Sequence, residues 1–343
     1  MDKISIVSLL LTRKCNLSCS YCAISRDYKD IPPEYPKLSY YHKNEMTTGF
    51  VIDTLNKLKK HNPDVFVLVY GGEPLLRTDL PKIIQHCHDN DIHYTIISNN
   101  TDEVEPALKR LIKRTDYIEG YTFSIDPLII IDDSDNDRVR KSQQGLERVL
   151  KYKEYISDLV AEITIDKRNI EYIVPLVRKM TDLGICSDLT FIDIAHTQHY
   201  DFSNISDRRL LVKPSQYLYD EFEIIYKEGL NVHLGKRFYD KVIATCESNM
   251  DCGIDKDYHN MTIDADGSVR LCLRIRGRLT PSTFLANEIF RNDGSIRKDF
   301  KQFIKTDYNN YCRGCNWSCA IMSRMTSRKE VNTNELIHTN RRK

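Results

Sequence analysis

The sequence predicts an α/β fold, a partial (β/α)6 TIM-like barrel with a small C-terminal cysteine-rich extension made of a β-hairpin and a helix. Short apolar runs rich in β-branched and aromatic residues alternate with longer segments of helical periodicity over residues 1–200. Several runs are apolar almost throughout, which is typical of parallel strands covered on both faces. The cysteines are the third observation, because they gather after the first run and again in the last third of the chain.

Each expected strand is a short apolar run that precedes a helical segment. The strands are predicted at Ile4–Thr12, Val65–Tyr70, Tyr94–Ser98, Tyr121–Asp126, Glu162–Asp166 and Leu189–Ala195. The helices are predicted at Thr47–His61, Leu80–Asn90, Val104–Thr115, Gln143–Ser157 and Ile170–Leu183. Functional groups in such barrels collect on the loops after the carboxyl ends of the strands, so the chemistry is expected there.

The chain is expected to divide into consecutive parts. These are a barrel over 1–200, a connecting helical region over 201–245, an auxiliary domain over 246–325 and a basic tail over 326–343. The connecting region contains a predicted helix at Pro214–Gly229. The auxiliary domain contains a predicted hairpin at Met261–Cys272 that turns at Asp266-Gly267, and a helical stretch near Ile296–Lys305.

Composition narrows the class of protein. The 343 residues include 50 Lys and Arg and 49 Asp and Glu, so the net charge is +1 and nucleic acid is not an expected partner. No apolar run approaches the length of a membrane span, and no small-residue cleavage site follows the short run Ile4–Leu10. Eleven cysteines without an export signal favour the reducing cytoplasm, where thiols stay free to bind metals. Cys87 and Cys186 stand apart and are expected to be buried apolar residues.

Three cysteines follow the first predicted strand at the spacing C-x3-C-x2-C, namely Cys15, Cys19 and Cys22. Thiolates this close together on one loop can enclose one soft metal centre. On a cluster of four irons, three thiolates would leave one iron without a protein ligand, and metal sites perform chemistry at such open positions. The alternative interpretations are a zinc knuckle that lacks its fourth ligand, and coincidence.

With this spacing, and with Tyr21 directly before the last cysteine, the sequence resembles the radical S-adenosylmethionine (SAM) superfamily. The resemblance implies a [4Fe–4S] cluster on Cys15, Cys19 and Cys22, with the amino and carboxylate groups of SAM on the open iron. It implies that an electron from a reducing partner such as a flavodoxin or ferredoxin cleaves SAM. The resulting 5′-deoxyadenosyl radical would then remove a hydrogen atom from the substrate.

Three further segments resemble motifs of the same superfamily. Tyr70–Pro74 is similar to the GGEP motif that holds the SAM amino group, Ser98–Thr101 to a TNG-type turn, and Ser124–Pro127 to a segment beside the ribose and the methionyl carboxylate. Paired glycines would let the backbone approach a ligand closely, and a glutamate can accept from an ammonium group. A tight turn or a helix cap is the alternative interpretation of each motif alone. The cofactor-binding residues that the resemblance implies are Tyr21, Gly71, Gly72, Glu73, Pro74, Ser98, Asn99, Ser124 and Asp126.

Six more cysteines lie in the last third of the chain, around the predicted hairpin and in a later C-x2-C-x3-C run. A hairpin that holds a metal centre against such a run would stabilise a small domain without a large core. The region resembles the SPASM or twitch extension of radical SAM enzymes, which implies one auxiliary [4Fe–4S] cluster; a zinc ribbon is the alternative. The expected ligands are Cys252, Cys272, Cys312 and Cys315, and the alternative set is Cys246, Cys252, Cys272 and Cys319.

The substrate is expected near the carboxyl ends of the last two barrel strands. Asp193, His196 and His199 follow the sixth run and are candidates for binding substrate or moving a proton; a polar surface loop is the alternative. Glu162 and Thr164 on the fifth run could reach the SAM carboxylate or the substrate.

Three functions are compatible with these features. The first is a radical SAM enzyme that modifies a peptide by epimerisation, crosslinking or dehydrogenation. The second applies the same radical chemistry to a small molecule or nucleotide, in a dehydrogenation or isomerisation. The third is a non-catalytic binding module stabilised by zinc, which would bind no iron–sulfur cluster.

Overall fold

The computed structural model describes residues 4–19, 22, 24, 37–131, 137–191, 212, 215–233, 235, 239, 260–270 and 284–303. At its centre lies an open eight-stranded sheet with the strand order β6-β5-β4-β3-β2-β1-β7-β8. The strands are β1 (Ile6–Thr12), β2 (Phe66–Gly71), β3 (His93–Ser98), β4 (Ile118–Ile125), β5 (Ile156–Ile165), β6 (Cys186–Phe191), β7 (Asn260–Ile263) and β8 (Val269–Arg270). Neighbours from β6 to β7 run parallel, whereas β7 and β8 run antiparallel. The predicted α/β fold with a partial barrel is therefore confirmed.

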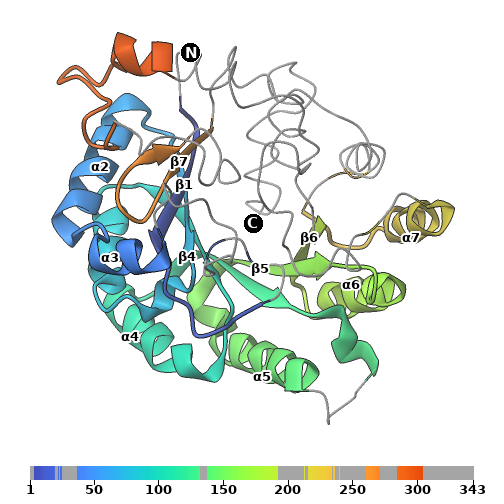
Figure 1. Ribbon diagram of the computed structural model, residues 1–343. Helices are drawn as coiled ribbons and strands as arrows, with labels where there is room; N and C mark the ends of the chain where they lie inside the picture. Colours follow the sequence, from blue (N-terminus) through green and yellow to red (C-terminus); the bar gives the residue numbers. More distant parts are fainter. Residues whose placement is uncertain are drawn as a thin grey trace.

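The helices are α1 (Leu38–Lys43), α2 (Thr48–His61), α3 (Leu80–Asp89), α4 (Glu105–Thr115), α5 (Asp137–Tyr152), α6 (Ile173–Asp182) and α7 (Gln216–Lys227). Helices α2 to α7 form an arc around the outer face of the sheet (Figure 1), whereas α1 lies apart from them. Short 3-10 turns are η1 (Pro74–Leu76), η2 (Asp102–Val104), η3 (Pro127–Ile131), η4 (Lys153–Tyr155) and η5 (Ile170–Tyr172). The amino ends of α2 and α7 are capped by side chains, because the Thr47 hydroxyl accepts from the Phe50 amide at 3.2 Å and the Ser215 hydroxyl from the Leu218 amide at 3.2 Å.

The largest difference from the predicted elements lies between α5 and β5. The sequence predicts a helix that ends at Ser157, whereas α5 ends at Tyr152 and β5 already begins at Ile156. Apolar residues in this stretch fit helical spacing as well as a strand, so periodicity alone cannot separate the two. Pairing with β4 sets Ile118 beside Ile156 and buries Ile156. This segment therefore forms a strand rather than a continuation of the helix.

The two faces of the sheet differ in chemistry where β1 to β3 lie. On the face that the helices cover, side chains such as Val7 and Leu9 belong to the main buried core. The opposite, inner face carries a smaller apolar cluster of Leu10, Tyr41, Tyr70 and Ala265, with Ile24 and Ile97 packed against it. The inner face near β1 is therefore apolar and partly covered.

Across β4, β5 and β6 the inner face becomes polar. Residues paired in register on neighbouring parallel strands point to the same face. Ile97 of β3 lies on the inner face, and the register places further residues on that same face. The register pairs are Ile97 with Thr122, Ser124 with Glu162, Glu162 with Asp188, and Thr164 with Thr190. Hydroxyl and carboxylate groups thus line the inner face here, where a polar ligand could be received.

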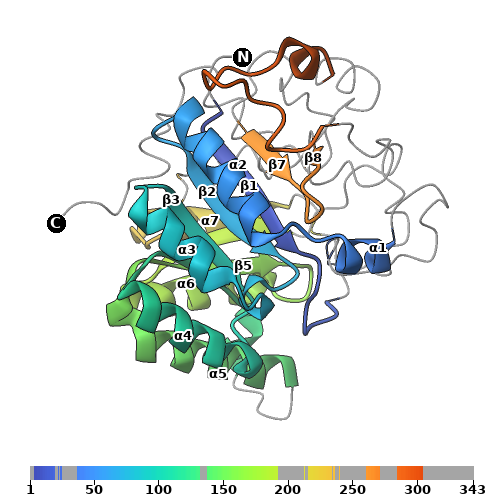
Figure 2. The ribbon, with the colours of Figure 1, turned by 90° about the vertical axis from the view of Figure 1, so that its left-hand side faces the viewer.

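The predicted hairpin forms from β7 and β8, and it turns at residues 264–268 with Gly267 at a φ of 84°. A positive φ of this kind favours glycine. β7 also pairs in parallel with β1, with Ile6 beside Asn260 and Leu9 beside Ile263, so the hairpin extends the barrel sheet (Figure 2). The sequence predicts the hairpin and not this pairing. Of the stretch predicted as helical near Ile296–Lys305, residues 298–303 are helical.

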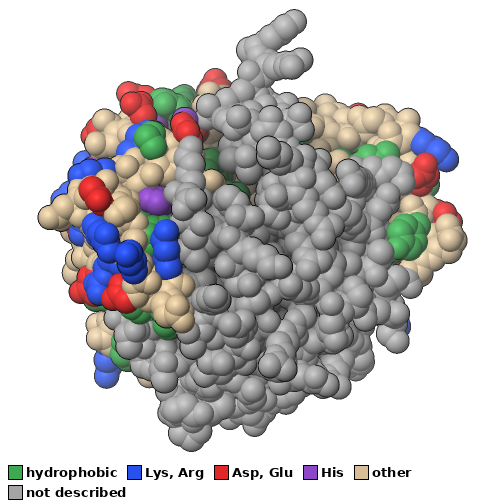
Figure 3. Space-filling model, turned by 90° about the horizontal axis from the view of Figure 1, so that it is seen from above, with side chains coloured by type: hydrophobic (Ala, Val, Ile, Leu, Met, Phe, Trp, Pro, Cys, Tyr) green, Lys and Arg blue, Asp and Glu red, His purple; other side chains and the backbone are tan. Residues whose placement is uncertain are grey.

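Charged side chains of both signs are interspersed over the described surface seen from above, in keeping with the net charge near zero (Figure 3). None of the helices in the described ranges combines the length and the apolar content that a membrane crossing requires. Cys87 on α3 and Cys186 on β6 are buried, as predicted.

Candidate functional site

The cysteine loop, residues 13–24, follows the carboxyl end of β1. Cys15, Cys19 and Cys22 are each partly exposed in it. The Cys22 amide donates to the Cys19 carbonyl at 3.1 Å, which holds the backbones of the last two cysteines together. The Leu17 amide donates to the Cys15 sulfur at 3.4 Å, and the Ile24 amide to the Cys22 sulfur at 3.3 Å. Amide donors of this kind stabilise thiolates that ligate iron.

The Cys15 thiol lies in the field of neighbouring negative groups. Burial raises the pKa of Cys15, and the negative charges of Glu73, Cys22 and Cys19 raise it further, although the Leu17 amide lowers it. A cationic centre between the thiols would reverse this repulsion. Among the described residues, no three His, Cys, Asp or Glu side chains converge on one metal-ion position. Three thiolates on one loop match the number of ligands that a four-iron cluster takes when one iron stays open, whereas a structural zinc ion takes four protein ligands.

Gly71 and Gly72 are needed because the chain after β2 lies directly against the chain after β1. A Cβ on Gly71 would lie 2.3 Å from the Thr12 carbonyl oxygen, and one on Gly72 would lie 2.1 Å from that of Lys14. The Gly72 amide donates to the Thr12 carbonyl at 2.7 Å, and the Glu73 amide to the Lys14 carbonyl at 2.8 Å. The sequence predicts that these glycines let the backbone approach a ligand. In the structure they let the backbone after β2 approach the backbone after β1, and the two loops form one unit.

Glu73 is fully buried at the centre of this unit. Its carboxylate accepts from the Leu75 amide at 3.0 Å, from the Ser98 hydroxyl at 3.0 and 3.1 Å, and from the Asn99 amide at 2.8 Å. Burial raises the pKa of Glu73 to about 7, although the hydrogen bonds from Asn99, Leu75 and Ser98 lower this pKa. Since burial destabilises the charged form of this carboxylate, an ammonium group brought against it would be bound with charge assistance.

Asn99 connects Glu73 to the cysteines. Its backbone donates to Glu73, while its side-chain Nδ2 donates to the Cys15 sulfur at 3.6 Å and to the Asn16 Oδ1 at 2.9 Å. Asn16 in turn donates to the Thr101 hydroxyl at 2.6 Å. The turn after β3 thus contacts both the carboxylate and the first cysteine, and it brings Ser98 and Asn99 beside Glu73.

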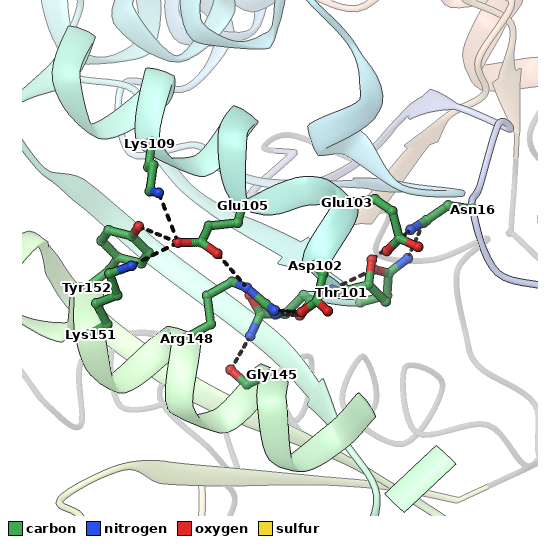
Figure 4. A network of polar contacts seen from close by, with 12 residues as sticks. Asn16, Thr101, Asp102, Glu103, Glu105, Lys109, Gly145, Arg148, Lys151 and Tyr152 are labelled. Atoms are coloured by element: carbon green, nitrogen blue, oxygen red, sulfur yellow. Dashed lines mark hydrogen bonds and ion pairs between the residues drawn. The ribbon is translucent and has the colours of Figure 1, made fainter. Parts of the chain in front are cut away.

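A buried arginine on α5 supports this turn from outside (Figure 4). Arg148 donates to the Asn100 carbonyl and to Asp102, and its Nε lies 3.5 Å from Glu105 Oε2. Asn100 has a φ of 51°, and its Nδ2 donates to the Gly145 carbonyl of α5 at 2.6 Å. Sequence reasoning missed Arg148, because nothing in a helix rich in charged residues marks one arginine as buried.

The remaining predicted residues lie at strand ends or outside the described ranges. Ser124 is exposed near the end of β4, and Asp126 is buried beyond it, with its amide donating to the Ser142 hydroxyl at 3.3 Å. Burial, and then the charge of Asp188, raises the pKa of Glu162 to about 7. The positions outside the described residues are Tyr21, Asp193, His196, His199 and the six cysteines Cys246, Cys252, Cys272, Cys312, Cys315 and Cys319.

Comparison with known families agrees with this geometry. Residues 9–192, more than half of the chain, match the family model described as the Radical SAM superfamily. The chain belongs to this superfamily, which implies a [4Fe–4S] cluster and SAM as cofactors.

Curated relatives share part of the sequence. The chain is 24% identical over 234 residues to a radical SAM cyclopropyl synthase, TigE of Paramaledivibacter caminithermalis, covering 65% of this chain and 44% of that protein. It is 25% identical over 215 residues to a PqqA peptide cyclase of Xanthomonas axonopodis (62% and 52%). It is 28% identical over 127 residues to an S-adenosylmethionine-dependent nucleotide dehydratase of Selenomonas ruminantium (36% and 41%). The chain thus spans about half the length of these relatives or less.

Solved structures share the fold at low sequence identity. SuiB of Streptococcus suis bound to S-adenosylmethionine superposes with a TM-score of 0.61 at 14% identity, over 89% of this chain and 68% of that one. The protein anSMEcpe with bound AdoMet gives a TM-score of 0.61 at 14% identity, over 98% and 99% of the two chains. These likenesses establish the partial barrel and its open sheet.

Proposed function

We propose that this chain cleaves SAM reductively at a [4Fe–4S] cluster on Cys15, Cys19 and Cys22 and uses the resulting radical to modify a peptide. The observation that carries the proposal is the contact between the cysteine loop, Glu73 and Asn99 at the carboxyl ends of three adjacent strands. When bound, the cluster and SAM supply the electron transfer and the carbon-centred radical that protein side chains cannot supply.

The residues of this chain would bind and orient these groups. The three cysteines would hold three irons and leave the fourth for SAM. Glu73 would accept from the SAM ammonium, because the fully buried carboxylate gains most from a cation. Ser124 and Asp126, at the end of β4, would lie toward the ribose and the methionyl carboxylate, with Gly71, Gly72 and Pro74 shaping the loop.

A peptide is the favoured substrate class. Support comes from the relative named as a peptide cyclase and from the polar inner face of β4 to β6, whose Glu162, Thr164 and Asp188 could bind backbone amides or a cationic side chain. Epimerisation, crosslinking and dehydrogenation of a residue are all within this chemistry. Asp193, His196 and His199 remain predicted substrate or proton-transfer residues.

The alternative substrate is a nucleotide or another small molecule. It is favoured by the match to a nucleotide dehydratase, which covers 36% of this chain. In either case we propose an auxiliary [4Fe–4S] cluster on Cys252, Cys272, Cys312 and Cys315, or on the set that includes Cys246 and Cys319. We also propose a flavodoxin or ferredoxin as the reducing partner.

The test is anaerobic reconstitution of the full chain with iron and sulfide. We expect about eight irons per chain, and about four in Cys15→Ala because one of two cubanes is lost. The wild type should release 5′-deoxyadenosine from SAM under reduction, and Cys15→Ala should not. Incubation with candidate peptides and with nucleotides, followed by mass spectrometry, then separates the two substrate classes. SAM cleavage by a triple variant of Cys15, Cys19 and Cys22 would refute the assignment.

A further inference from the structure

Arg13, two residues before the first cysteine, lies in a buried position between β1 and the hairpin. Its Nε donates to Asp264 Oδ1 at 2.9 Å and its Nη2 to Asp264 Oδ2 at 2.7 Å, and the two side chains are 5% and 6% exposed. Its Nη1 donates to the Ile24 carbonyl at 3.1 Å. The guanidinium also stacks over the Tyr41 ring, 4.2 Å from the centroid. One side chain thus contacts the hairpin, the far end of the cysteine loop and α1.

The hairpin presents Asp264 in a fixed position. The Asp264 amide donates to the Ser268 carbonyl at 2.9 Å, and Asp264 Oδ1 also accepts from the Ala265 amide at 2.7 Å. Because β7 pairs with β1, this carboxylate lies beside the end of β1, where the cysteine loop begins. The hairpin therefore offers a rigid anion at the base of the loop.

A buried ion pair is not explained by stability alone. Removing two charges from water costs several kcal/mol per ion, so replacing such a pair with apolar residues is often neutral or stabilising. The fork of an arginine, however, fixes the direction of a carboxylate and leaves a further donor for a third group. Here that donor binds the carbonyl of Ile24, two residues after Cys22. The same guanidinium therefore fixes both ends of the cysteine loop.

We propose that Arg13 is a positioning residue that fixes the cysteine loop against Asp264 of the β7–β8 hairpin, so that retention of the cluster depends on the hairpin. The proposal rests on the proposed function, since it assumes that the loop holds the cluster. If Arg13 acts in this way, the chemistry at the N-terminal cysteine loop requires the β7–β8 hairpin from the C-terminal part of the chain.

The first test measures the loop without the cluster. Hydrogen–deuterium exchange of the full apo chain should show the peptides over 13–24 exchanging about tenfold faster in Asp264→Asn, because the charge-assisted fork is lost. Peptides from β4 and β5 should exchange as in the wild type. Arg178→Lys is the matched control, since Arg178 makes a similar fork with Glu228 at an exposed position on α6.

The second test measures the loop with the cluster. After reconstitution, Asp264→Asn and Arg13→Lys should release iron to a chelator about tenfold faster than the wild type and Arg178→Lys. The double variant Arg13→Gln with Asp264→Asn should release iron faster than Asp264→Asn alone, because it also removes the donor to the Ile24 carbonyl. Arg13→Lys keeps the charge, so it tests the fork even if Arg13→Gln fails to fold.

Two results would overturn the inference. Exchange over 13–24 in Asp264→Asn equal to the wild type would show that the pair does not hold the loop. Exchange that rises equally in β4 and β5 would show a general role in stability. A wild-type chain that binds no cluster on its three N-terminal cysteines would refute the proposed function instead, and the exchange experiment would still decide the role of Arg13.

Discussion

Gly72→Ala tests the join between the two loops of the site. A Cβ at this position would lie 2.1 Å from the Lys14 carbonyl oxygen and 2.5 Å from the Lys14 carbonyl carbon, both backbone atoms that no side-chain rotation can move. Ordinary contacts between non-bonded heavy atoms begin near roughly 3.5 Å, so the loops must separate by about 1 Å or more. The substitution therefore displaces the chain that carries the cysteines.

The expected cost has two parts. Forcing a methyl group into a packed position costs about 1–3 kcal/mol. Separation of the loops also weakens the hydrogen bonds from Gly72 to Thr12 and from Glu73 to Lys14, at about 1 kcal/mol each. The free energy of unfolding should fall by about 3–5 kcal/mol, a large part of the ~5–15 kcal/mol typical of a folded protein.

The measurement is urea unfolding followed by circular dichroism, together with iron content after reconstitution. Gly49→Ala is the matched control, because Gly49 is exposed in the first turn of α2 and the nearest atom to its new Cβ would lie 4.0 Å away. That variant should be neutral or more stable by about 0.5–1 kcal/mol. If Gly72→Ala unfolds like the wild type and binds as much iron, the two loops do not meet as described.

Three further variants probe the surroundings of the cysteine loop. Folding raises the pKa of Glu73 from 4.5 to about 7, so this group favours the folded state below pH ~4.5 and loses that contribution as the pH rises through ~7. Relative to Glu73→Gln, the wild type should lose about 3 kcal/mol of stability over that range, and parallel pH profiles in urea unfolding would contradict this. Asn99→Leu removes a donor from the Cys15 sulfur, so the cluster midpoint in an EPR-monitored titration should fall by roughly 30–60 mV; an unchanged midpoint would show that the contact is not made in the loaded protein. Arg148→Met leaves the Asn100 carbonyl without its charged donor and should lower the unfolding free energy by about 2–3 kcal/mol, whereas a loss below ~0.5 kcal/mol would argue against a supporting role.

Much of the barrel could be predicted from local patterns. β2 and β3 lie within one residue of their predicted bounds, and α2 and α4 begin one residue after theirs, because hydrophobic period and capping residues are encoded over a few neighbours. The segment from Tyr152 to Glu162 shows the limit. Its apolar residues suit a helix or a strand, and the pairing with β4 made the choice.

The site was predictable where one residue type has one chemical use. Three closely spaced thiols and a glutamate after a Gly-Gly pair can be recognised in the sequence. Arg13, Asn100 and Arg148 cannot, since arginine and asparagine are common on surfaces and only the neighbours in space reveal that these three are buried. The sequence also does not show why positions 71 and 72 must be glycine. The structure does, because the backbone of Thr12 and Lys14 lies where a side chain would begin.

By itself the sequence identified the side chains that the proposed radical SAM chemistry would use and where most of the strands lie, because ligand type, spacing and periodicity are local properties. Only the tertiary structure decided that β7 lies beside β1 and that Arg13 meets Asp264, 251 residues further along the chain. Such a contact depends on the order in which distant strands pair in the sheet, and no local pattern records it.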